Sequence, residues 1–414
     1  MGADSVRSAA IGRPAWQLRA VLALLASLLT ASELQAQADE SDAPEPKVTT
    51  VFRFGGYGKL DVLGTAYRDG DVEPESPLRD IHIPAAIPLG ADFDNDDLDF
   101  HVKESRFHFG TETTFGNGRK LTTYIELDFM LSKAGDERVS NSFNPRLRHF
   151  YATYDKWLFG QTWSTFMIVT LPDDLDFAGA AEGIVFNRQP MVRFTTGNWQ
   201  FALENPESTA TPFEGGASRI VTESGRLPDV VARYNFAPSW GSLSVAGILR
   251  GHEYEVPAEG VDENTTGFGA TVGGRIPVGT RDDIRFQLNA GKGLGRYLAM
   301  GSVNGVMLDA ANRLHALPTV SGFVAYLHHW NDQWRSSVNF SALHASNDTD
   351  LTSEGANAEF WSASANVLYS PVPPLTIGLE FMHAERKLES GVRGRFDRLQ
   401  FSARYDFDFT AGGH

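Results

Sequence analysis

Polar and apolar residues alternate along much of this chain. The alternation is clear in RFQLNA (285–290), in LQFSARYDF (399–407) and in TTYIELDF (122–129). Successive side chains of a β-strand point to opposite faces, so each of these segments would have one apolar and one polar face. Few stretches place apolar residues at the spacing of an amphipathic helix. The chain is therefore predicted to be all-β.

The alternating segments predict about sixteen strands, joined in turn by short and long connections. Long polar connections are expected at 68–98, 130–145, 164–187, 205–228, 251–265, 293–318, 345–358 and 387–395. The expected strands are 52–67, 99–115, 120–129, 146–154, 157–163, 188–196, 199–205, 229–236, 242–250, 266–276, 284–292, 319–330, 334–344, 359–369, 375–386 and 396–409.

Two architectures suit such strands. In a soluble sandwich or barrel the apolar faces point inward, whereas in an outer-membrane barrel they face lipid and the polar faces line the lumen. Short turns on one rim and long loops on the other are typical of the second architecture, as are aromatic residues at strand ends such as Trp157, Trp199 and Trp334. We therefore expect a transmembrane antiparallel β-barrel over 51–409.

The first residues predict export from the cytoplasm. Arg7, Arg13 and Arg19 precede the apolar run 20–30, and Ala36-Gln37-Ala38 fits a small-x-small cleavage site. This pattern indicates a secretory signal peptide at 1–38, because the apolar run is shorter than the ~20 residues of a membrane-spanning helix. Residues 39–50 would be a flexible lead and 410–414 a C-terminal tail. The expected location is the bacterial outer membrane.

Composition narrows the chemistry. The chain has no Cys, which excludes disulfides, thiol catalysis and Cys-ligated metals. It carries 52 acidic and 36 basic residues, a balance that argues against a nucleic-acid partner. Asp92-x-Asp94-x-Asp96 lacks the glycine that a calcium loop needs, and the adjacent His328 and His329 would face opposite sides of a strand. No metal, cofactor or catalytic residue is predicted.

Assigning alternate residues to opposite faces places many basic side chains in the lumen. In the strand 146–154, for example, Leu147 and Tyr151 are expected to face lipid, so Arg146 and Arg148 face inward. Arg188, beside the connection 164–187, is added to this pore-lining set. The set is Lys59, Arg106, Arg146, Arg148, Arg188, Arg193, Arg233, Arg285, Arg335, Arg398 and Arg404.

Acidic residues are also expected in the lumen, among them Glu126, Asp128 and Glu380. Each inward arginine therefore has two interpretations. It pairs with an acid across the wall, or it contacts a passing solute. An excess of arginine at the narrowest point would favour anions, and the planar guanidinium suits carboxylates because it donates two parallel hydrogen bonds. The sequence leaves both interpretations open for any single arginine.

Several stretches carry a family resemblance. They include GYGKLDVLG (56–64), SRFHFGTET (105–113), PRLRHFYATY (145–154), LFGQTWSTFM (158–167), LDFAG (175–179), VFNRQPMVRFT (185–195) and DRLQFSARYDF (397–407). With them the chain resembles the DcaP-like porins, trimeric outer-membrane channels associated with dicarboxylate uptake. The resemblance implies a homotrimer and a third loop, 164–187, that folds inward to narrow each pore.

An inward third loop would place further residues at the constriction, namely Thr165, Asp173, Asp174 and Asp176. These would meet solute, although anchoring of the loop by Asp173 and Asp174 to wall arginines is the favoured interpretation. The function expected from the whole sequence is passive diffusion of small anions, in contact with lipid and lipopolysaccharide. The alternatives are a general or cation-preferring porin, a barrel enzyme such as a lipase, and a receptor acting through its loops.

Overall fold

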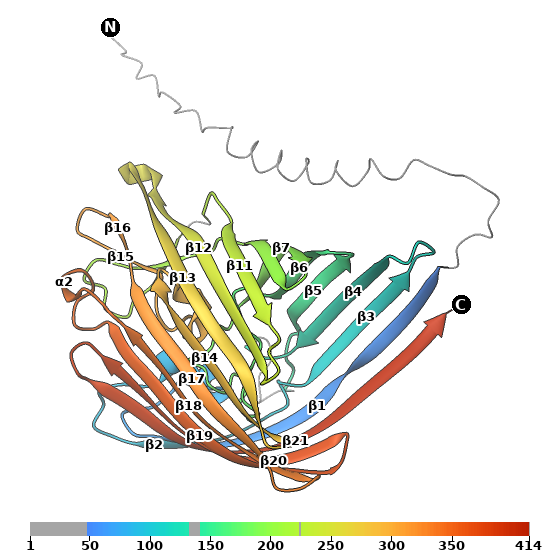
Figure 1. Ribbon diagram of the computed structural model, residues 1–414. Coiled ribbons are helices and arrows are strands. Elements are labelled where there is room, and N and C mark those ends of the chain that lie inside the picture. Colours follow the sequence, from blue (N-terminus) through green and yellow to red (C-terminus); the bar gives the residue numbers. More distant parts are fainter. Residues whose placement is uncertain (1–47, 132–140, 223–224, 414) are drawn as a thin grey trace, which may run out of the picture. The chain divides into compact units, whose positions relative to one another are not determined.

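The barrel closes between the two ends of the chain. The computed structural model describes residues 48–131, 141–222 and 225–413. Within them, β1 (Thr49–Tyr67) pairs antiparallel with β21 (Arg393–Gly413) from Thr50 to Tyr67. Sixteen strands form the closed wall, which confirms the predicted fold class (Figure 1). The predicted signal peptide and residues 39–47 of the lead lie outside the described residues.

The strands of the wall follow one another around the barrel in chain order. After β1 they are β3 (Arg106–Thr114), β4 (Lys120–Asp128), β5 (Arg146–Tyr154), β6 (Trp157–Trp163), β7 (Arg188–Thr196), β8 (Trp199–Glu204), β11 (Asp229–Phe236), β12 (Ser242–Val256), β13 (Val261–Val278), β14 (Asp282–Lys292), β17 (Pro318–His329), β18 (Trp334–Ala345), β19 (Asn357–Val372), β20 (Leu375–Leu388) and β21.

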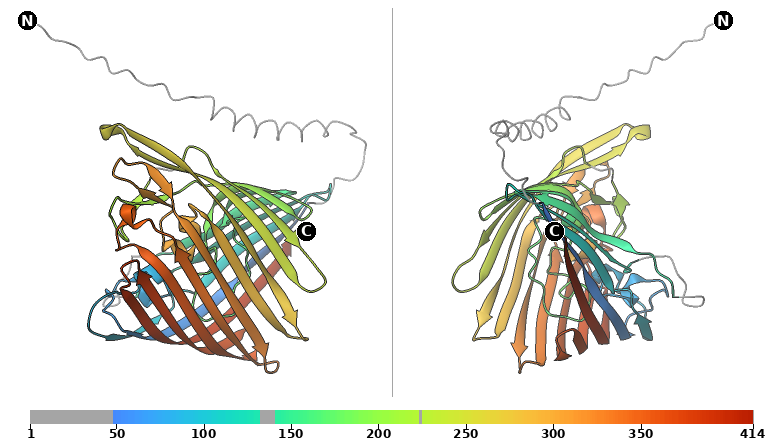
Figure 2. Two further views of the ribbon diagram at one scale, coloured as in Figure 1. Left: turned by 60° about the vertical axis from the view of Figure 1, so that its left-hand side comes forward. Right: turned by 90° about the vertical axis from the view of Figure 1, so that its right-hand side faces the viewer.

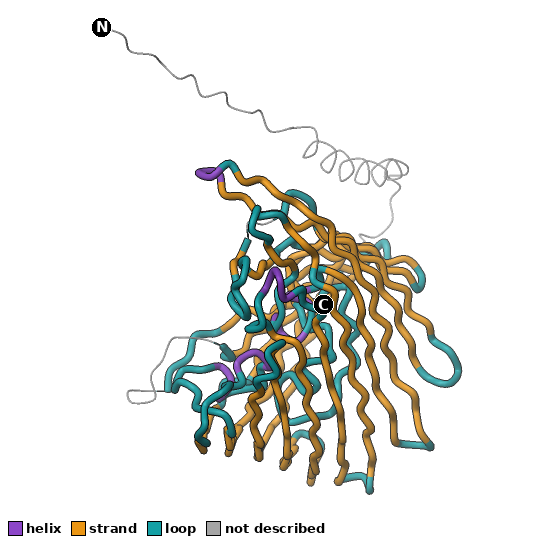
Figure 3. The backbone as a smooth tube through the Cα atoms, turned by 90° about the vertical axis from the view of Figure 1, so that its left-hand side faces the viewer, coloured by secondary structure: helices purple, strands orange, loops and turns teal. Residues whose placement is uncertain are grey.

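The remaining elements lie in the long loops. A four-stranded sheet joins L4 (205–228) to L6 (293–317), and the helices are all short (Figure 3). These elements are β2 (Asn95–His101), β9 (Thr209–Thr211), β10 (Ile220–Val221), β15 (Val306–Leu308), β16 (Leu314–Ala316), η1 (Pro77–Arg79), η2 (Pro84–Ala86), η3 (Pro257–Glu259), η4 (Gly295–Tyr297), η5 (Ala299–Gly301) and α2 (Thr349–Thr352). No helix among the described residues is long and apolar enough to cross a membrane.

The two rims differ as the sequence predicts. The short turns lie at one end of the strands, and the long loops, with α2, β15 and β16, lie at the other (Figures 1 and 2). Outward positions carry exposed apolar side chains such as Phe340, Leu379 and Phe401, whereas the inward neighbours Ser341 and Gln400 are buried. The apolar faces therefore point outward, as in a barrel surrounded by lipid.

Some predicted boundaries are wrong. The expected loop 251–265 is mostly a hairpin, because β12 and β13 stay paired as far as Val256 and Val261. Arg226 of L4 pairs with Asp262 (3.0 Å) and Glu255, and so offsets the repulsion among the acids of this hairpin. Likewise the expected loop 387–395 shrinks to 389–392, and β21 runs through most of the expected tail to Gly413.

The predicted strand 99–115 is interrupted. Its first part is β2 and its second part is β3, and both pair with β1. Between them Val102–Ser105 opposes only three residues of β1, since His101 pairs with Asp61 and Arg106 with Tyr57. The extra residue forms a bulge that turns Glu104 inward, where its Oε2 lies 2.5 Å from Lys59 Nζ. A buried ion pair thus explains the irregularity.

A second bulge overturns one face assignment. In β5, Leu147 pairs with Leu127 and His149 with the preceding Glu126, so Arg148 is the extra residue. Arg148 and His149 are consequently both buried, at 2% and 6% exposure, and Phe150 is 59% exposed. The alternation shifts by one residue beyond this point. Tyr151, predicted to face lipid, instead pairs with Tyr124 on the lumen side, with ring centroids 5.6 Å apart.

The third loop, L3 (164–187), folds into the barrel as predicted. Gly183 N donates to Ser341 Oγ of β18 at 2.7 Å, and Asn289 Nδ2 of β14 donates to Gly183 O at 2.7 Å. A Cβ on Gly183 would lie 2.2 Å from the carbonyl oxygen of Gly322 in β17. Only glycine permits such a close approach of the loop backbone to the wall.

Candidate solute passage

Arginines on one part of the wall bind L3. Arg233 Nη1 donates to Met167 O at 2.9 Å, and Arg285 Nη1 donates to Leu171 O at 2.6 Å. Arg193 Nε donates to Thr165 Oγ1 at 2.8 Å. An irregular loop inside a barrel has carbonyl groups without secondary-structure partners, and Arg233 and Arg285 satisfy two of them.

Charged residues from the following strands bind the turn of L3, which comprises residues 173–176. Arg335 Nε lies 2.6 Å from Asp173 Oδ2, and Arg398 Nη1 lies 3.7 Å from Asp176 Oδ2. Lys59 Nζ donates to Leu175 O at 2.6 Å. Glu380 accepts hydrogen bonds from the backbone N–H groups of Leu175 (2.8 Å) and Asp176 (3.1 Å). Six of the predicted basic residues therefore bind the third loop.

L3 also contains the other predicted constriction residues. Thr165 is buried, and its N–H donates to Glu204 Oε1 at 2.7 Å. Asp174 Oδ2 accepts from Asn339 Nδ2 at 2.5 Å, so its partner is an amide and not an arginine. Burial, followed by the nearby carboxylates of Glu380 and Asp176, raises the pKa of Asp174 well above its usual value. The turn of the loop is thus an acidic region enclosed by cations.

The wall from β3 to β6 is different. No hydrogen bond or ion pair joins L3 to the described residues of these four strands, whereas L3 is bonded to β7, β8, β11, β14, β18–β21 and β1. We call β3–β6 the open wall, and the arc from β7 through β21 to β1 the sealed wall. L3 instead contacts the open wall through aromatic rings, for example Phe186 against Trp163 with ring centroids 5.0 Å apart.

Three predicted arginines project from the open wall, together with two acids. Arg146 binds Asp128 through two hydrogen bonds of 2.8 and 2.7 Å. Arg148 bridges Glu126 (2.6 Å) and Asp128 (2.8 Å), and Arg106 Nε lies 3.5 Å from Glu126. Three cations and two carboxylates leave a positive excess. The acids hold the guanidinium groups in place without neutralising all of them.

One aromatic ring of L3 faces this cluster. The ring centroid of Phe177 lies 5.2 Å from the guanidinium carbon of Arg148, 5.5 Å from that of Arg146 and 6.0 Å from that of Arg106. Arg188, at the start of β7, stacks 4.5 Å from Trp163 and 5.6 Å from Phe186. No described carboxylate pairs with Arg188, and its Nη1 is buried without a hydrogen-bond partner.

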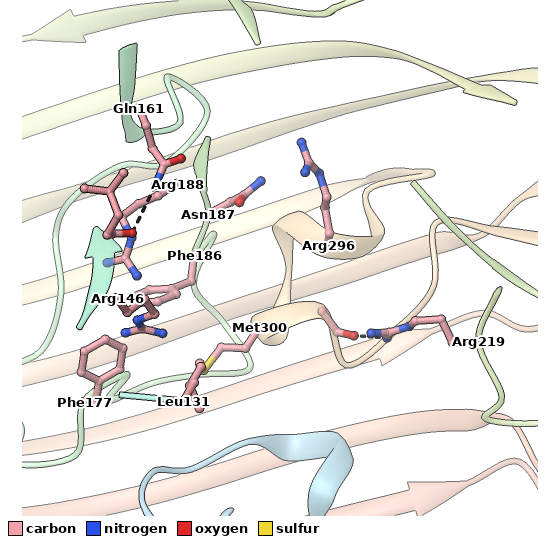
Figure 4. A pocket seen from close by; sticks show the side chains of 12 residues that line it. Leu131, Arg146, Gln161, Phe177, Phe186, Asn187, Arg188, Arg219, Arg296 and Met300 are labelled. Atoms are coloured by element: carbon pink, nitrogen blue, oxygen red, sulfur yellow. Dashed lines mark hydrogen bonds between the residues drawn. The ribbon is translucent and has the colours of Figure 1, made fainter. Parts of the chain in front are cut away.

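A cavity of about 390 Å³ lies among residues of L3, L4 and L6, and Figure 4 shows the side chains that line it. Arg146, Phe177, Phe186 and Arg188 line one side of it. Arg219 of L4 lines the other side, and Arg296 of L6 lies between the two. Sequence reasoning missed both of these arginines and both aromatic residues, because loop positions have no periodicity from which a direction could be inferred. The last predicted residue, Arg404, lies elsewhere and pairs with Asp406 at 2.5 Å.

Among the described residues, little supports the alternative that the barrel is an enzyme. Ser208 Oγ lies 2.5 Å from His252 Nδ1, which is the arrangement of a nucleophile and a base. Both residues are buried, however, and His252 Nε2 has no hydrogen-bond partner and lies among Gly267, Gly293 and Gly305. No cluster of three potential metal-binding side chains occurs among the residues that the structure describes.

Comparisons with known proteins agree with this architecture. A family model described as DcaP outer membrane protein matches residues 59–407. The outer membrane channel DcaP of Acinetobacter baumannii has a TM-score of 0.72 and 24% identity, over 90% of this chain and 100% of that chain. No curated protein sequence matches the chain.

Two more distant solved structures share the fold. An anion-selective porin from Comamonas acidovorans has a TM-score of 0.52 and 11% identity, over 87% of this chain and 100% of that chain. A loop-deletion mutant of OmpT from Vibrio cholerae has a TM-score of 0.50 and 11% identity, over 86% and 99%. The family match confirms the resemblance seen in the sequence and extends over most of the chain: this protein belongs to the DcaP outer membrane protein family.

Proposed function

We propose that this protein is a passive channel that favours small anions, and that dicarboxylates are its main solutes. The observation that carries the proposal is the division of the wall. L3 is bonded to most strands of the sealed wall, so a solute would pass along the open wall, where Arg106, Arg146 and Arg148 outnumber Glu126 and Asp128. Such a surplus attracts anions and disfavours cations of similar size.

Arginine chemistry supports the carboxylate class. A guanidinium group donates two parallel hydrogen bonds to a carboxylate, and a partly desolvated guanidinium binds it more strongly than an exposed one. Arg188 has no described carboxylate partner and remains available for such a bond. The existing acids keep the site from binding too strongly, because a channel must release what it admits. The sequence resemblance to dicarboxylate channels points to the same solutes.

The first test is the reversal potential of single channels in a KCl gradient. We expect the wild-type protein to favour chloride, and Arg188→Gln to reduce that preference, since it removes a charge that no described acid balances. Arg226→Gln is the matched control, because Arg226 is exposed and already bound by three acids of the β12–β13 hairpin. Preference of the wild type for potassium would refute the proposal and support the general-porin alternative.

Two other functions and the assembly need separate measurements. Phospholipid hydrolysis that Ser208→Ala abolishes would support the barrel enzyme. A closed channel with tight binding to a macromolecule would support the receptor.

We also propose a homotrimer in contact with lipid and lipopolysaccharide, as the resemblance implies. Chemical cross-linking in native membranes tests the trimer, and a ladder that stops at the monomer would refute it.

A further inference from the structure

The cavity beside L3 has a second basic side that comes from other loops. Arg219 lies in L4 between β9 and β10, and Arg296 lies in η4 of L6. Figure 4 shows Arg146 and Arg188 on one side of the cavity and Arg219 on the opposite side, with Arg296 between them. Cations from four separate segments therefore surround one space.

The two loop arginines bind only neutral groups. Arg219 Nε donates to Asn304 Oδ1 at 2.8 Å, and its Nη2 donates to Gly301 O. Arg296 Nη2 donates to Asn205 O at 2.5 Å and to Gln189 Oε1. Arg296 Nε is buried and has no hydrogen-bond partner in the described part of the chain. Neither residue pairs with a described carboxylate, so no described acid balances the charge of either one.

Other arginines of the same loops show that this arrangement is selective. Arg226 of L4 pairs with Glu253, Glu255 and Asp262, and Arg313 of L6 pairs with Asp309 at 2.7 Å. The arginines that point away from the cavity are thus neutralised by nearby acids. The two arginines of these loops that line the cavity, Arg219 and Arg296, are held by amide and carbonyl oxygens, which fix the side chain and leave its charge uncompensated.

We propose that Arg219 and Arg296 are specificity-determining residues, which bind one end of a doubly charged anion while Arg146 and Arg188 bind the other end. The inference rests on the proposed channel for dicarboxylates and adds the loop residues that select the solute by its valence. A dianion satisfies both sides of the cavity, whereas a monoanion leaves one side unpaired. The loops on the long-loop rim therefore distinguish divalent from monovalent solutes at this cavity.

The test compares two anions of different valence on the purified protein in planar bilayers. Succinate or acetate is added on the long-loop side, and the concentration that halves the chloride current is measured. For Arg219→Gln with Arg296→Gln we expect a rise of about tenfold for succinate, because hydrogen bonds to a charged group are lost, and less than about twofold for acetate. Arg226→Gln with Arg313→Gln should leave both values unchanged.

A purely structural role of these arginines predicts a different pattern. If they only hold L4 against L6, succinate and acetate values will change by the same factor, and the proposal is refuted. Arg219→Lys with Arg296→Lys keeps the charges but changes the loop contacts, and we expect it to retain most of the preference for succinate. In every variant the KCl reversal potential should still favour chloride. A wild type that favours potassium would instead refute the anion channel itself.

Discussion

The sealed and open walls of this barrel use the same residue type for different purposes. On the sealed wall, Arg233 and Arg285 donate to carbonyl groups of L3. On the open wall, Arg106 and Arg146 lie beside Glu126 and Asp128 and face the ring of Phe177. All four occupy inward positions on strands, and what lies opposite each one decides its role. An inward arginine is therefore not by itself evidence of solute contact.

The difference follows from the needs of an irregular loop inside a barrel. L3 has few backbone partners of its own, and each buried carbonyl without a donor costs about 1–3 kcal/mol. Guanidinium groups can supply several donors from a single side chain, so arginine suits the sealed wall. Where L3 makes no such bonds, the arginines pair with Glu126 and Asp128 instead, and these are the side chains to which we assign the solute. The comparison predicts that substitutions in the sealed wall change the conductance or the current noise, whereas substitutions in the open wall change the reversal potential.

The largest expected effect comes from detaching L3 from the sealed wall. Gly183→Val would place side-chain atoms against the Gly322 carbonyl group, because the Cβ alone would lie 2.2 Å from the carbonyl oxygen. We expect the loop to move from the wall, with a several-fold change in single-channel conductance and a loss of about 1–3 kcal/mol in stability.

The matched control for this variant is Gly58→Val. A Cβ on Gly58 meets no atom within 4 Å, and the residue faces outward. Its conductance should equal that of the wild type in the same bilayers. Equal conductance of Gly183→Val and the control would show that the loop does not depend on this contact.

The second effect separates the two walls directly. Arg106→Gln with Arg146→Gln should shift the KCl reversal potential toward the value for potassium, while Glu126 and Asp128 remain paired with Arg148. Arg285→Gln with Arg335→Gln should instead increase current noise, because Leu171 O and Asp173 lose donors.

Both pairs are compared by single-channel recording under identical salt conditions. Each removes two positive charges, so net charge alone predicts equal shifts of the reversal potential. Equal shifts would therefore remove the distinction between the sealed and open walls.

The fold was largely predictable because a barrel wall obeys a simple periodic rule. Alternation located all sixteen strands and placed the long loops on one rim. It failed at Arg148, where a bulge shifts the pattern and turns Tyr151 inward. It also failed at Val102–Ser105, where the ion pair between Glu104 and Lys59 stabilises a bulge. A bulge depends on partners distant in sequence, and period-two reasoning contains no information about them.

The candidate site was predictable only in part, for the same reason. Inward arginines followed from strand periodicity, but their division into the two walls depends on the path of L3. That path is set by contacts such as Glu380 with the backbone of Leu175, which join residues about two hundred positions apart. Arg219, Arg296 and Phe177 lie in loops, where a side chain's direction comes from tertiary contacts alone.

A smaller effect should follow from pH at the turn of L3. Burial and the carboxylates of Glu380 and Asp176 raise the pKa of Asp174. An acid with a raised pKa favours the folded arrangement while it is protonated, and this contribution is lost as the pH rises through the raised pKa. We therefore expect current noise to increase with rising pH, as the new charge repels its neighbours.

Asp174→Asn tests this sign in the same recordings. The amide cannot ionise, so the variant should lose much of the increase in noise at high pH. Arg335 lies beside Asp173 and partly offsets the new charge, which keeps the effect modest. Noise that rises on acidification would contradict the assignment.

The smallest expected effect tests the contact between L3 and the open wall. Phe177→Leu keeps an apolar side chain but removes the ring that lies within 6.0 Å of three guanidinium carbons. Each cation–π contact at such a site contributes about 0.5–1 kcal/mol, and the ion pairs with Glu126 and Asp128 remain. We expect chloride preference to fall by about twofold, because the guanidinium groups become less well ordered. Phe166→Leu, a buried L3 residue that contacts Tyr297 at 5.8 Å, controls for the loss of a ring within the loop. If both variants change selectivity equally, the ring of Phe177 acts through the packing of L3 and not through the arginines that it faces.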